Sequence, residues 1–151
     1  TRDDVDHSKI AITGRSQGGG ITIAVSGLVP DLAIAMPDVP FLTHFQRAVG
    51  LTDKQPYQEI VAYLHTHREK EERVFETLSY FDGMNFAART NAECFYTTAL
   101  MDEVCPPSTV FAAYNQISSA KKIDVYRFNG HEGGGALDNI RKLKWLKERW
   151  G

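Results

Sequence analysis

The feature that most constrains this chain is a G-x-S-x-G sequence at residues 14–18 (GRSQG), placed between two apolar segments. Residues 9–13 (KIAIT) are apolar and β-branched, which is typical of a buried strand in a parallel sheet. Residues 21–28 are apolar almost all round, which indicates a helix pressed closely against that sheet. A serine in such a strand-to-helix turn is a nucleophile elbow, and its strained backbone is tolerated if Gly14 and Gly18 leave room for it.

The serine of this turn is Ser16, and the next residue, Gln17, would begin the helix. Because the first N–H groups of a helix have no intrahelical partner, the amide of Gln17 is expected to provide half of an oxyanion hole. Two other interpretations remain open, a serine that merely caps the helix and a phosphate-binding loop. Against the second, no Lys-Ser or Lys-Thr pair follows the glycines, and Ser16 stands where a dinucleotide fingerprint has glycine.

The remaining pattern predicts one α/β domain over residues 1–151 with a mostly parallel sheet and helices on both faces. Between the second and third strands, apolar residues recur at helical spacing over residues 41–86, which is longer than an ordinary connection and suggests a helical insertion. Further strands are expected at residues 31–36, 94–100 and 123–128, and helices at residues 107–117 and 137–146.

Candidates for an acid and a base follow the last two predicted strands, at the carboxyl edge where α/β sheets place their sites. Asp102 follows the third strand, and His131 follows the fourth by a short turn. The chain order Ser, Asp, His is that of the α/β-hydrolases. Glu103 is a rival acid, and Asp102 and His131 could be ordinary loop residues. The glycines at 133–135 are expected to leave space around the imidazole.

No other group of residues predicts a metal or cofactor site. His65 and His67 lie two apart on an expected helix and so point to different faces, and His131-Glu132 lacks the second histidine of a zinc-protease helix. His7 and His44 have no evident partner. The two cysteines, Cys94 and Cys105, lack metal-ligand spacing, and free thiols in a reducing compartment are expected.

Charge and hydropathy exclude several classes of partner. With 17 basic and 19 acidic side chains the formal net charge is −2, which disfavours nucleic acid and anionic membranes. The apolar stretches are too short to span a membrane, and residues 1–9 lack the features of a signal peptide, so a cytoplasmic location is expected. The mixed charges of residues 68–73 (REKEER) predict a solvated face.

The chain resembles the acetyl xylan esterase and cephalosporin-C deacetylase family, the seventh carbohydrate esterase family, nearly end to end. The motifs that carry the resemblance are residues 14–20 (GRSQGGG), 36–42 (MPDVPFL), 66–72 (THREKEE), 78–87 (LSYFDGMNFA), 100–113 (LMDEVCPPSTVFAA) and 130–135 (GHEGGG). The resemblance implies an α/β-hydrolase fold with Ser16 as nucleophile, Asp102 as orienting acid and His131 as base. It also implies removal of acetyl groups from short acetylated sugars and related small esters, no metal or other cofactor, and assembly as a homohexamer.

Two departures from the family pattern accompany the resemblance. Arg15 stands where many relatives have a small residue, and its side chain is expected to point away from the elbow. The family's first strands, its Arg-Gly-Gln motif and the second oxyanion donor would precede this chain, which therefore resembles the C-terminal half of the enzyme. We accordingly expect an exposed edge at residues 9–13 and poor activity of the isolated chain. A peptidase, a lactone hydrolase and a non-catalytic fragment with a packing role remain alternatives.

Overall fold

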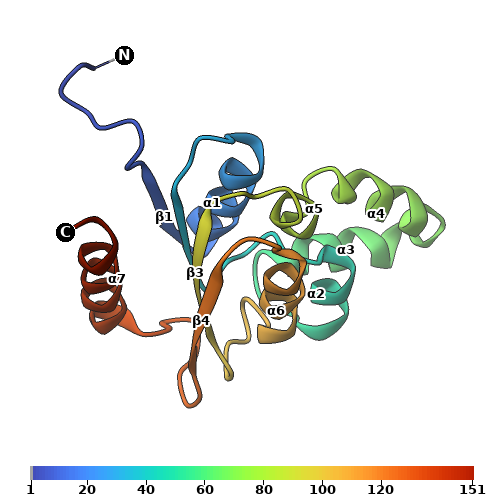
Figure 1. The fold of residues 1–151 in the computed structure, drawn as a ribbon. Helices are drawn as coiled ribbons and strands as arrows, with labels where there is room; N and C mark the ends of the chain where they lie inside the picture. The colour runs from blue at the N-terminus through green and yellow to red at the C-terminus, as the bar shows by residue number, and fades with distance from the viewer. Residues whose placement is uncertain (1) are drawn as a thin grey trace.

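Four parallel strands form the sheet of this protein in a computed structural model, which describes residues 2–151 and leaves only Thr1 of the expected domain outside (Figure 1). Their order in the sheet, β1-β2-β3-β4, follows the chain, so β1 and β4 lie at the two edges of the described sheet. The expected exposed edge near residues 9–13 is thus present, at β1. The strands are Ala11–Arg15 (β1), Ile34–Asp38 (β2), Glu93–Ala99 (β3) and Lys121–Tyr126 (β4).

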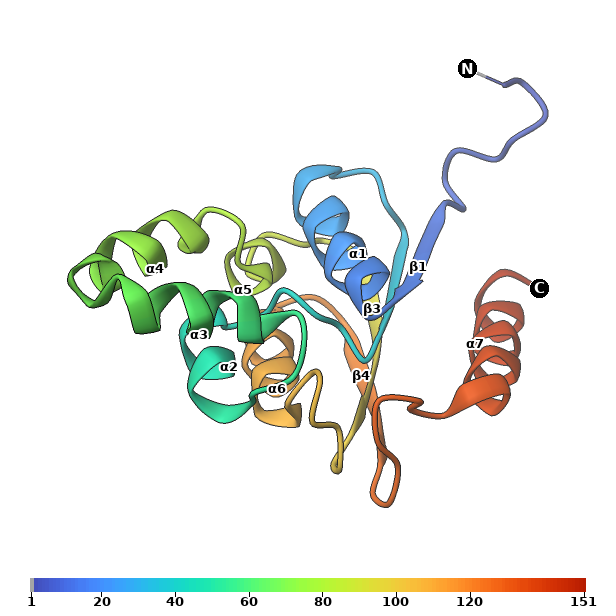
Figure 2. The same cartoon turned by 180° about the vertical axis from the view of Figure 1, so that it is seen from behind.

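Helices cover both faces of the sheet, which confirms the predicted layer architecture (Figures 1 and 2). One face carries three helices, Gln17–Leu28 (α1), Gly83–Ala87 (α5) and Pro107–Gln116 (α6). The other face carries the C-terminal helix α7, Gly135–Trp150. The connections from β1 to β4 all run on the α1 side, so the chain crosses to the other face only after its last strand.

Strand β3 is buried on both faces, as its continuous apolar run predicts. Successive side chains of a strand point to opposite faces. Tyr96 therefore packs among residues of α1, α5 and α6, whereas Phe95 meets Trp145 of α7 with ring centroids 5.3 Å apart. Burying large aromatic rings on both sides fixes the register of the central strands, because a slip of one residue would exchange the two faces.

The chain between β2 and β3 is helical before it reaches α5, over the range where the sequence predicts helices. It contains Phe45–Leu51 (α2), Tyr57–Thr66 (α3), the 3₁₀ turn Arg68–Lys70 (η1) and Glu71–Ser79 (α4). These elements extend away from the sheet in both views (Figures 1 and 2). They share a small apolar core around Phe41, Phe45 and Tyr57, to which Cys105 also contributes. Residues 68–73 are exposed, as expected of a solvated face.

Strand β1 begins and ends two residues later than predicted, and β2 also extends beyond its predicted end at residue 36. Proline was expected to end β2, because it cannot donate to a ladder. In the structure Gly14 pairs with Pro37 and Arg15 with Asp38, whereas on the β3 side the register skips Met36 and Pro37 and resumes at Asp38. The proline therefore interrupts one ladder only, and Ser16 is placed at the true end of β1.

Helix α1 packs on the sheet as predicted, and two of its glycines also lie against backbone outside the sheet. A Cβ atom on Gly20 would lie 2.4 Å from the carbonyl oxygen of Phe41, and one on Gly27 would lie 2.4 Å from that of Phe86. These contacts are with the loop after β2 and with α5. The glycines thus let α1 approach backbone beside it in the helical layer.

The structure bears on two further expectations from the sequence. Among residues 2–151, no helix combines the length and apolarity that a membrane span requires. Cys94 and Cys105 are both free and both buried. Burial raises the pKa of Cys94 to about 11, and burial also raises the pKa of Cys105, with the nearby carboxylate of Asp102 adding to the effect.

We expect both thiols to resist alkylation in the folded protein, because the thiolate is the reactive form and burial disfavours it. For Cys94, a pKa raised from 9.0 to about 11 lowers the thiolate fraction about 100-fold near neutral pH. Mass spectrometry after timed exposure to iodoacetamide should show two labels gained in urea and almost none without it. Rapid labelling of either cysteine in the native protein would contradict this burial.

Candidate active site

The turn after β1 holds Ser16 in the strained conformation that the sequence predicts. Its backbone has φ 53° and ψ −115°, a positive φ that non-glycine residues seldom adopt. Three backbone hydrogen bonds fix the turn: the N–H of Ser16 donates to Asp38 at 2.9 Å, and its carbonyl accepts from Gly20 at 3.0 Å and Phe41 at 2.9 Å. The loop after β2 therefore pins the elbow from one side and α1 from the other.

The two glycines of the motif differ in what they contribute. A Cβ atom on Gly14 would lie 2.3 Å from the carbonyl oxygen of Gly18, so Gly14 is required for the turn to close. A Cβ atom on Gly18 would meet nothing within 4 Å in the described part of the chain. The expectation that both glycines make room for the serine is therefore wrong for Gly18. Its backbone carbonyl forms the close contact with Gly14, whereas a Cβ atom at position 18 would have open space around it.

Gly14→Ala is expected to destabilise the fold by about 1–3 kcal/mol, because overpacking forces backbone apart at the centre of the turn. The matched variant Gly18→Ala should stay within about 1 kcal/mol of the parent, since it adds a methyl group to open space on a helix. Urea unfolding followed by circular dichroism measures both. Equal effects from the two substitutions would mean that the close approach at Gly14 has been misassigned.

Asp102 lies in the turn after β3 with its carboxylate fully buried. One oxygen, Oδ1, accepts hydrogen bonds from the backbone N–H groups of Val104 and Cys105, both at 2.8 Å. The other, Oδ2, lies 2.9 Å from Nδ1 of His131. The two amide donors hold the carboxylate in one orientation, so it presents a single oxygen to the imidazole. Glu103 instead extends into solvent, 3.6 Å from Lys54.

The imidazole of His131 joins the other two groups. Its Nε2 lies 3.0 Å from Oγ of Ser16, and its Nδ1 faces Asp102. Because an ionised carboxylate can only accept, the proton of a neutral imidazole belongs on Nδ1, which leaves Nε2 free to accept from the serine hydroxyl. The structure thus brings together all three residues singled out in the sequence.

The glycines after His131 were expected to leave space around its ring. In the structure they serve mainly another purpose. Gly133 and Gly135 have φ of 55° and 52°, values that glycine adopts without strain. Gly134 packs so closely on Tyr126 that a Cβ atom would lie 2.2 Å from its ring. These residues turn the chain sharply from β4 into α7.

A buried polar cluster behind the His131 loop was not recognised in the sequence. The hydroxyl of Tyr126 donates to Oδ1 of Asp138 at 3.1 Å, and Nζ of Lys142 lies 2.6 Å from Oδ2 of the same carboxylate. Burial, together with the negative charge of Asp138, raises the pKa of Tyr126 to about 12. The i, i+4 spacing of Asp138 and Lys142 was the available signal, but it is common on exposed helix faces.

One group of potential metal ligands occurs among residues 2–151, and it overlaps the site. Asp102, Cys105 and His131 each place one ligand atom within 4.8 Å of the others. Both carboxylate oxygens of Asp102 already have hydrogen-bond partners in the protein, so the cluster is accounted for as a hydrogen-bonded site. His65 and His67 do not belong to this group: His65 is exposed, and the ring of His67 lies 4.5 Å from that of Tyr63 in a tilted contact.

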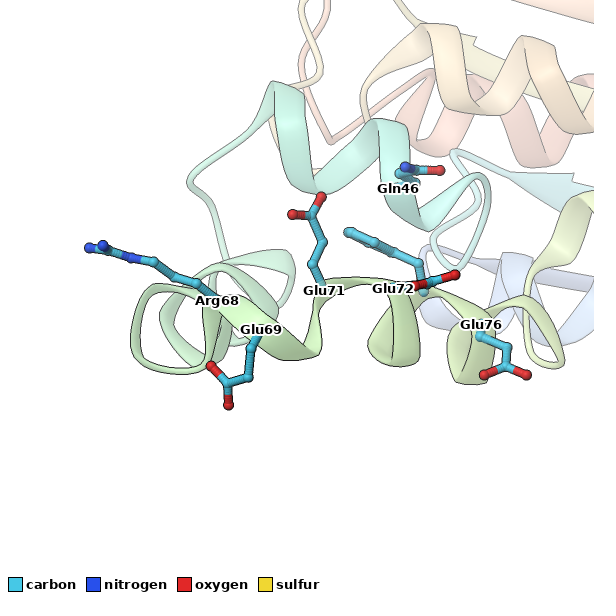
Figure 3. Close-up of a pocket in the computed structure, with 7 residues that line it drawn as sticks. Gln46, Arg68, Glu69, Glu71, Glu72 and Glu76 are labelled. Carbon is cyan, nitrogen blue, oxygen red and sulfur yellow. The ribbon is translucent and has the colours of Figure 1, made fainter.

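A hollow on the described surface lies elsewhere, between α2 and α4 (Figure 3). It has a volume of about 690 Å³ and is lined by Gln46, Phe75 and the charged side chains Arg68, Glu69, Glu71, Glu72 and Glu76. Glu69 and Glu76 point outward from the ribbon in the close-up. Another hollow, of about 380 Å³, reaches Asp102 from the side of Arg47 and Lys54. Ser16 and His131 line neither.

Comparison with known proteins places this geometry in a family. A family model described as acetyl xylan esterase (AXE1) matches residues 1–149. The chain belongs to the acetyl xylan esterase family. The resemblance noted in the sequence motifs is thereby confirmed, and the α/β-hydrolase fold is shown by the solved structures that the chain matches.

Two solved acetyl xylan esterases are similar over almost the whole chain. One, from Paenibacillus sp. R4, is 41% identical with a TM-score of 0.93, and the matched region covers 97% of this chain and 47% of that protein. The other, acetyl xylan esterase 1 from Thermoanaerobacterium sp. JW/SL YS485, is 37% identical with a TM-score of 0.92, covering 99% and 48%. Acetyl esterase Axe7A of Xylanibacter ruminicola is 29% identical over 97% of this chain and 32% of its own length.

The chain therefore spans about half the length of these solved esterases and about a third of the curated relative. An acylaminoacyl peptidase is 14% identical with a TM-score of 0.70, a likeness that shows the fold alone. Members of the acetyl xylan esterase family thus share this sheet, and more distant hydrolases share its architecture.

Proposed function

We propose that this chain carries the nucleophile, base and acid of an acetyl ester hydrolase that works through an acyl-enzyme. The observation that supports it most directly is the continuous hydrogen-bonded path from Ser16 Oγ to His131 Nε2 at 3.0 Å and from His131 Nδ1 to Asp102 Oδ2 at 2.9 Å. A nucleophile, a base within its reach and a group that orients the base are what acyl transfer needs. Family membership adds that the acyl group is acetyl.

In the first half of the reaction, Oγ of Ser16 attacks the ester carbonyl carbon while Nε2 of His131 takes the hydroxyl proton. The buried carboxylate of Asp102 stabilises the imidazolium that forms. The tetrahedral intermediate collapses as the bond to the alcohol oxygen breaks, and the proton on Nε2 passes to that oxygen. The sugar alcohol leaves, and the acetyl group remains on Ser16.

In the second half, Nε2 of His131 takes a proton from a water molecule that attacks the acetyl carbonyl, and the same proton returns to Oγ as acetate is released. Negative charge develops on the carbonyl oxygen in both halves. The N–H of Gln17 is at the first position of α1, where no intrahelical carbonyl pairs with it. It is the donor in this chain that we assign to the oxyanion.

The substrates proposed are short acetylated xylo-oligosaccharides and related small acetyl esters such as cephalosporin C. The support is the family, whose solved members with closely similar structures are acetyl xylan esterases. No metal or other cofactor enters the proposed steps, because the nucleophile is activated by His131 alone. A homo-oligomer, a hexamer by family resemblance, is proposed for the assembled enzyme.

Two measurements test the proposal. A chromogenic acetate ester should give a burst of product equal to the number of active sites followed by steady turnover, whereas peptide amides should not be cleaved. An organophosphonate should modify Ser16, which peptide mapping would locate. Cleavage of amides in preference to esters would point to a peptidase of the same fold, and an unmodified Ser16 would leave a packing role.

We propose that these 151 residues alone hydrolyse acetyl esters more than about 100-fold more slowly than a full-length family member. The resemblance implies a second oxyanion donor outside them, and loss of one such donor costs about that much. The relatives are two to three times as long, and β1 lies at the edge of the described sheet. Steady-state assays of the chain with and without a co-expressed N-terminal segment from a relative measure the difference. Full turnover by the chain alone would refute the need for a companion segment.

A further inference from the structure

The side chain of Arg15, the residue just before the elbow serine, was expected to point away from the elbow, but it reaches across to the loop that carries His131. Its guanidinium donates through Nη2 to the backbone carbonyl oxygen of His131. The same side chain lies near the carboxylate of Glu132, whose pKa is lowered mainly by its own backbone N–H and the amide of Asn129, and in smaller part by Arg15. Arg15 therefore spans the gap between the elbow and the His131 loop.

Asp38 supports the guanidinium from the neighbouring strand. Arg15 and Asp38 are register partners at the ends of β1 and β2, and Nε of the arginine lies 4.0 Å from Oδ2 of the aspartate. The aspartate is 7% exposed, and its Oδ1 accepts a hydrogen bond from the hydroxyl of Thr97 on β3. The backbone carbonyl of this same Asp38 receives the N–H of Ser16. One residue thus braces both the serine and the arginine beside it.

The loop that carries His131 is otherwise closed largely upon itself. Oε1 of Glu132 accepts from the side-chain amide of Asn129 at 3.0 Å and from the N–H of Gly130 at 3.1 Å. The N–H of Met101 donates to the carbonyl of Asn129 at 3.1 Å, which ties this loop to the one that holds Asp102. The bond from Arg15 provides the corresponding tie to the elbow.

We infer that Arg15 is a positioning residue, which holds the backbone of His131 so that Nε2 stays within reach of Ser16 Oγ throughout the reaction. The inference rests on the proposed function. The ring must exchange partners between serine, leaving alcohol and water, and during these exchanges its own bond to Ser16 is absent. A tie at the carbonyl of the same residue keeps the backbone fixed meanwhile. Small displacements matter here, because a shift of about 1 Å can cost roughly 100-fold in rate.

The exposure of Arg15 distinguishes positioning from stability. Its side chain is 42% exposed and lies 4.0 Å from Asp38, whose Oδ1 keeps the hydrogen bond from Thr97, so the ion pair contributes little to the free energy of folding. Removing the guanidinium should therefore leave the fold intact while loosening the His131 loop. An effect on rate without a matching loss of stability is the signature to look for.

The test compares Arg15→Met, which keeps the length of the side chain but removes its donors, with Arg15→Lys, which restores a charged donor. Arg149→Met is the matched control, because Arg149 binds Glu93 at the opposite end of β3, away from the elbow. We expect Arg15→Met to lower kcat about tenfold with KM changed less than about twofold, and Arg15→Lys to recover most of the loss. The control should match the parent.

A spectroscopic readout independent of turnover completes the test. The Nδ1 proton of His131, held against Asp102, should give a far-downfield proton resonance, which we expect to broaden in Arg15→Met and to sharpen again in Arg15→Lys. If the parent is active and Arg15→Met matches it in kcat and in this resonance, the positioning role is refuted. If the parent hydrolyses no acetyl ester but the resonance responds as expected, the proposed function is refuted, whereas the role of Arg15 in positioning His131 is supported.

Discussion

Replacing Ser16 with alanine is expected to lower kcat for a chromogenic acetate ester by about 10⁴- to 10⁶-fold, with KM little changed. The hydroxyl is the atom that becomes acetylated, and the other groups at the elbow cannot take its place. What remains would be the background that binding and the oxyanion donor provide. Stopped-flow and steady-state assays of the parent and the variant measure the loss.

The control for this prediction is Ser79→Ala, which removes a hydroxyl bonded to the carbonyl of Glu76 within α4. It should leave kcat within about twofold, as surface substitutions usually do. Residual activity of the Ser16 variant above about 1% of the parent would mean that another residue attacks the ester, and the elbow assignment would have to be abandoned.

Asp102→Asn should lower kcat by about 10⁴-fold while preserving the local structure. The side-chain oxygen of asparagine can still accept from Val104 and Cys105, the two amides now bound to Oδ1. Its NH₂ group would then face Nδ1 of His131 and could only donate. The imidazole proton would be moved to Nε2, which would no longer accept the proton of Ser16.

The matched control is Glu103→Gln, which alters the neighbouring acid that the sequence left as a rival. Glu103 is exposed and lies near Lys54, so kcat should change less than about twofold. The pH dependence of kcat/KM in both variants shows whether His131 still acts as the base. A large loss in Glu103→Gln with a small one in Asp102→Asn would exchange the two roles.

The sequence predicts the order of strands and helices because apolar periodicity and turn residues are local signals. It misplaced the ends of β1 and β2 because strand ends depend on pairing, and Pro37 keeps one partner while losing the other. The three candidate residues could be singled out because each follows a strand on the same sheet edge. The distances between them follow only from the folded loops.

Contacts between distant segments were beyond local patterns. The bond from Arg15 to the carbonyl of His131 joins residues 116 positions apart, and nothing near either residue signals it. The fit of Gly134 against Tyr126 likewise depends on how β4 and α7 meet. From its place in the motif, Gly18 was expected to be needed for lack of a side chain. In the structure, of the two motif glycines, only Gly14 is so close to its surroundings that a side chain would collide.

The placement of Cys105 has a consequence for redesign. Cys105 has two roles. Its backbone N–H orients the carboxylate of Asp102, and its side chain packs in the apolar core formed by Phe41, Phe45 and Tyr57. Exchanging the helices between β2 and β3 to change which ester is accepted would therefore also remove the apolar side chains that pack against Cys105 beside Asp102. Substitutions confined to the outer surface of α4 leave that apolar core intact, so a library of variants should begin there.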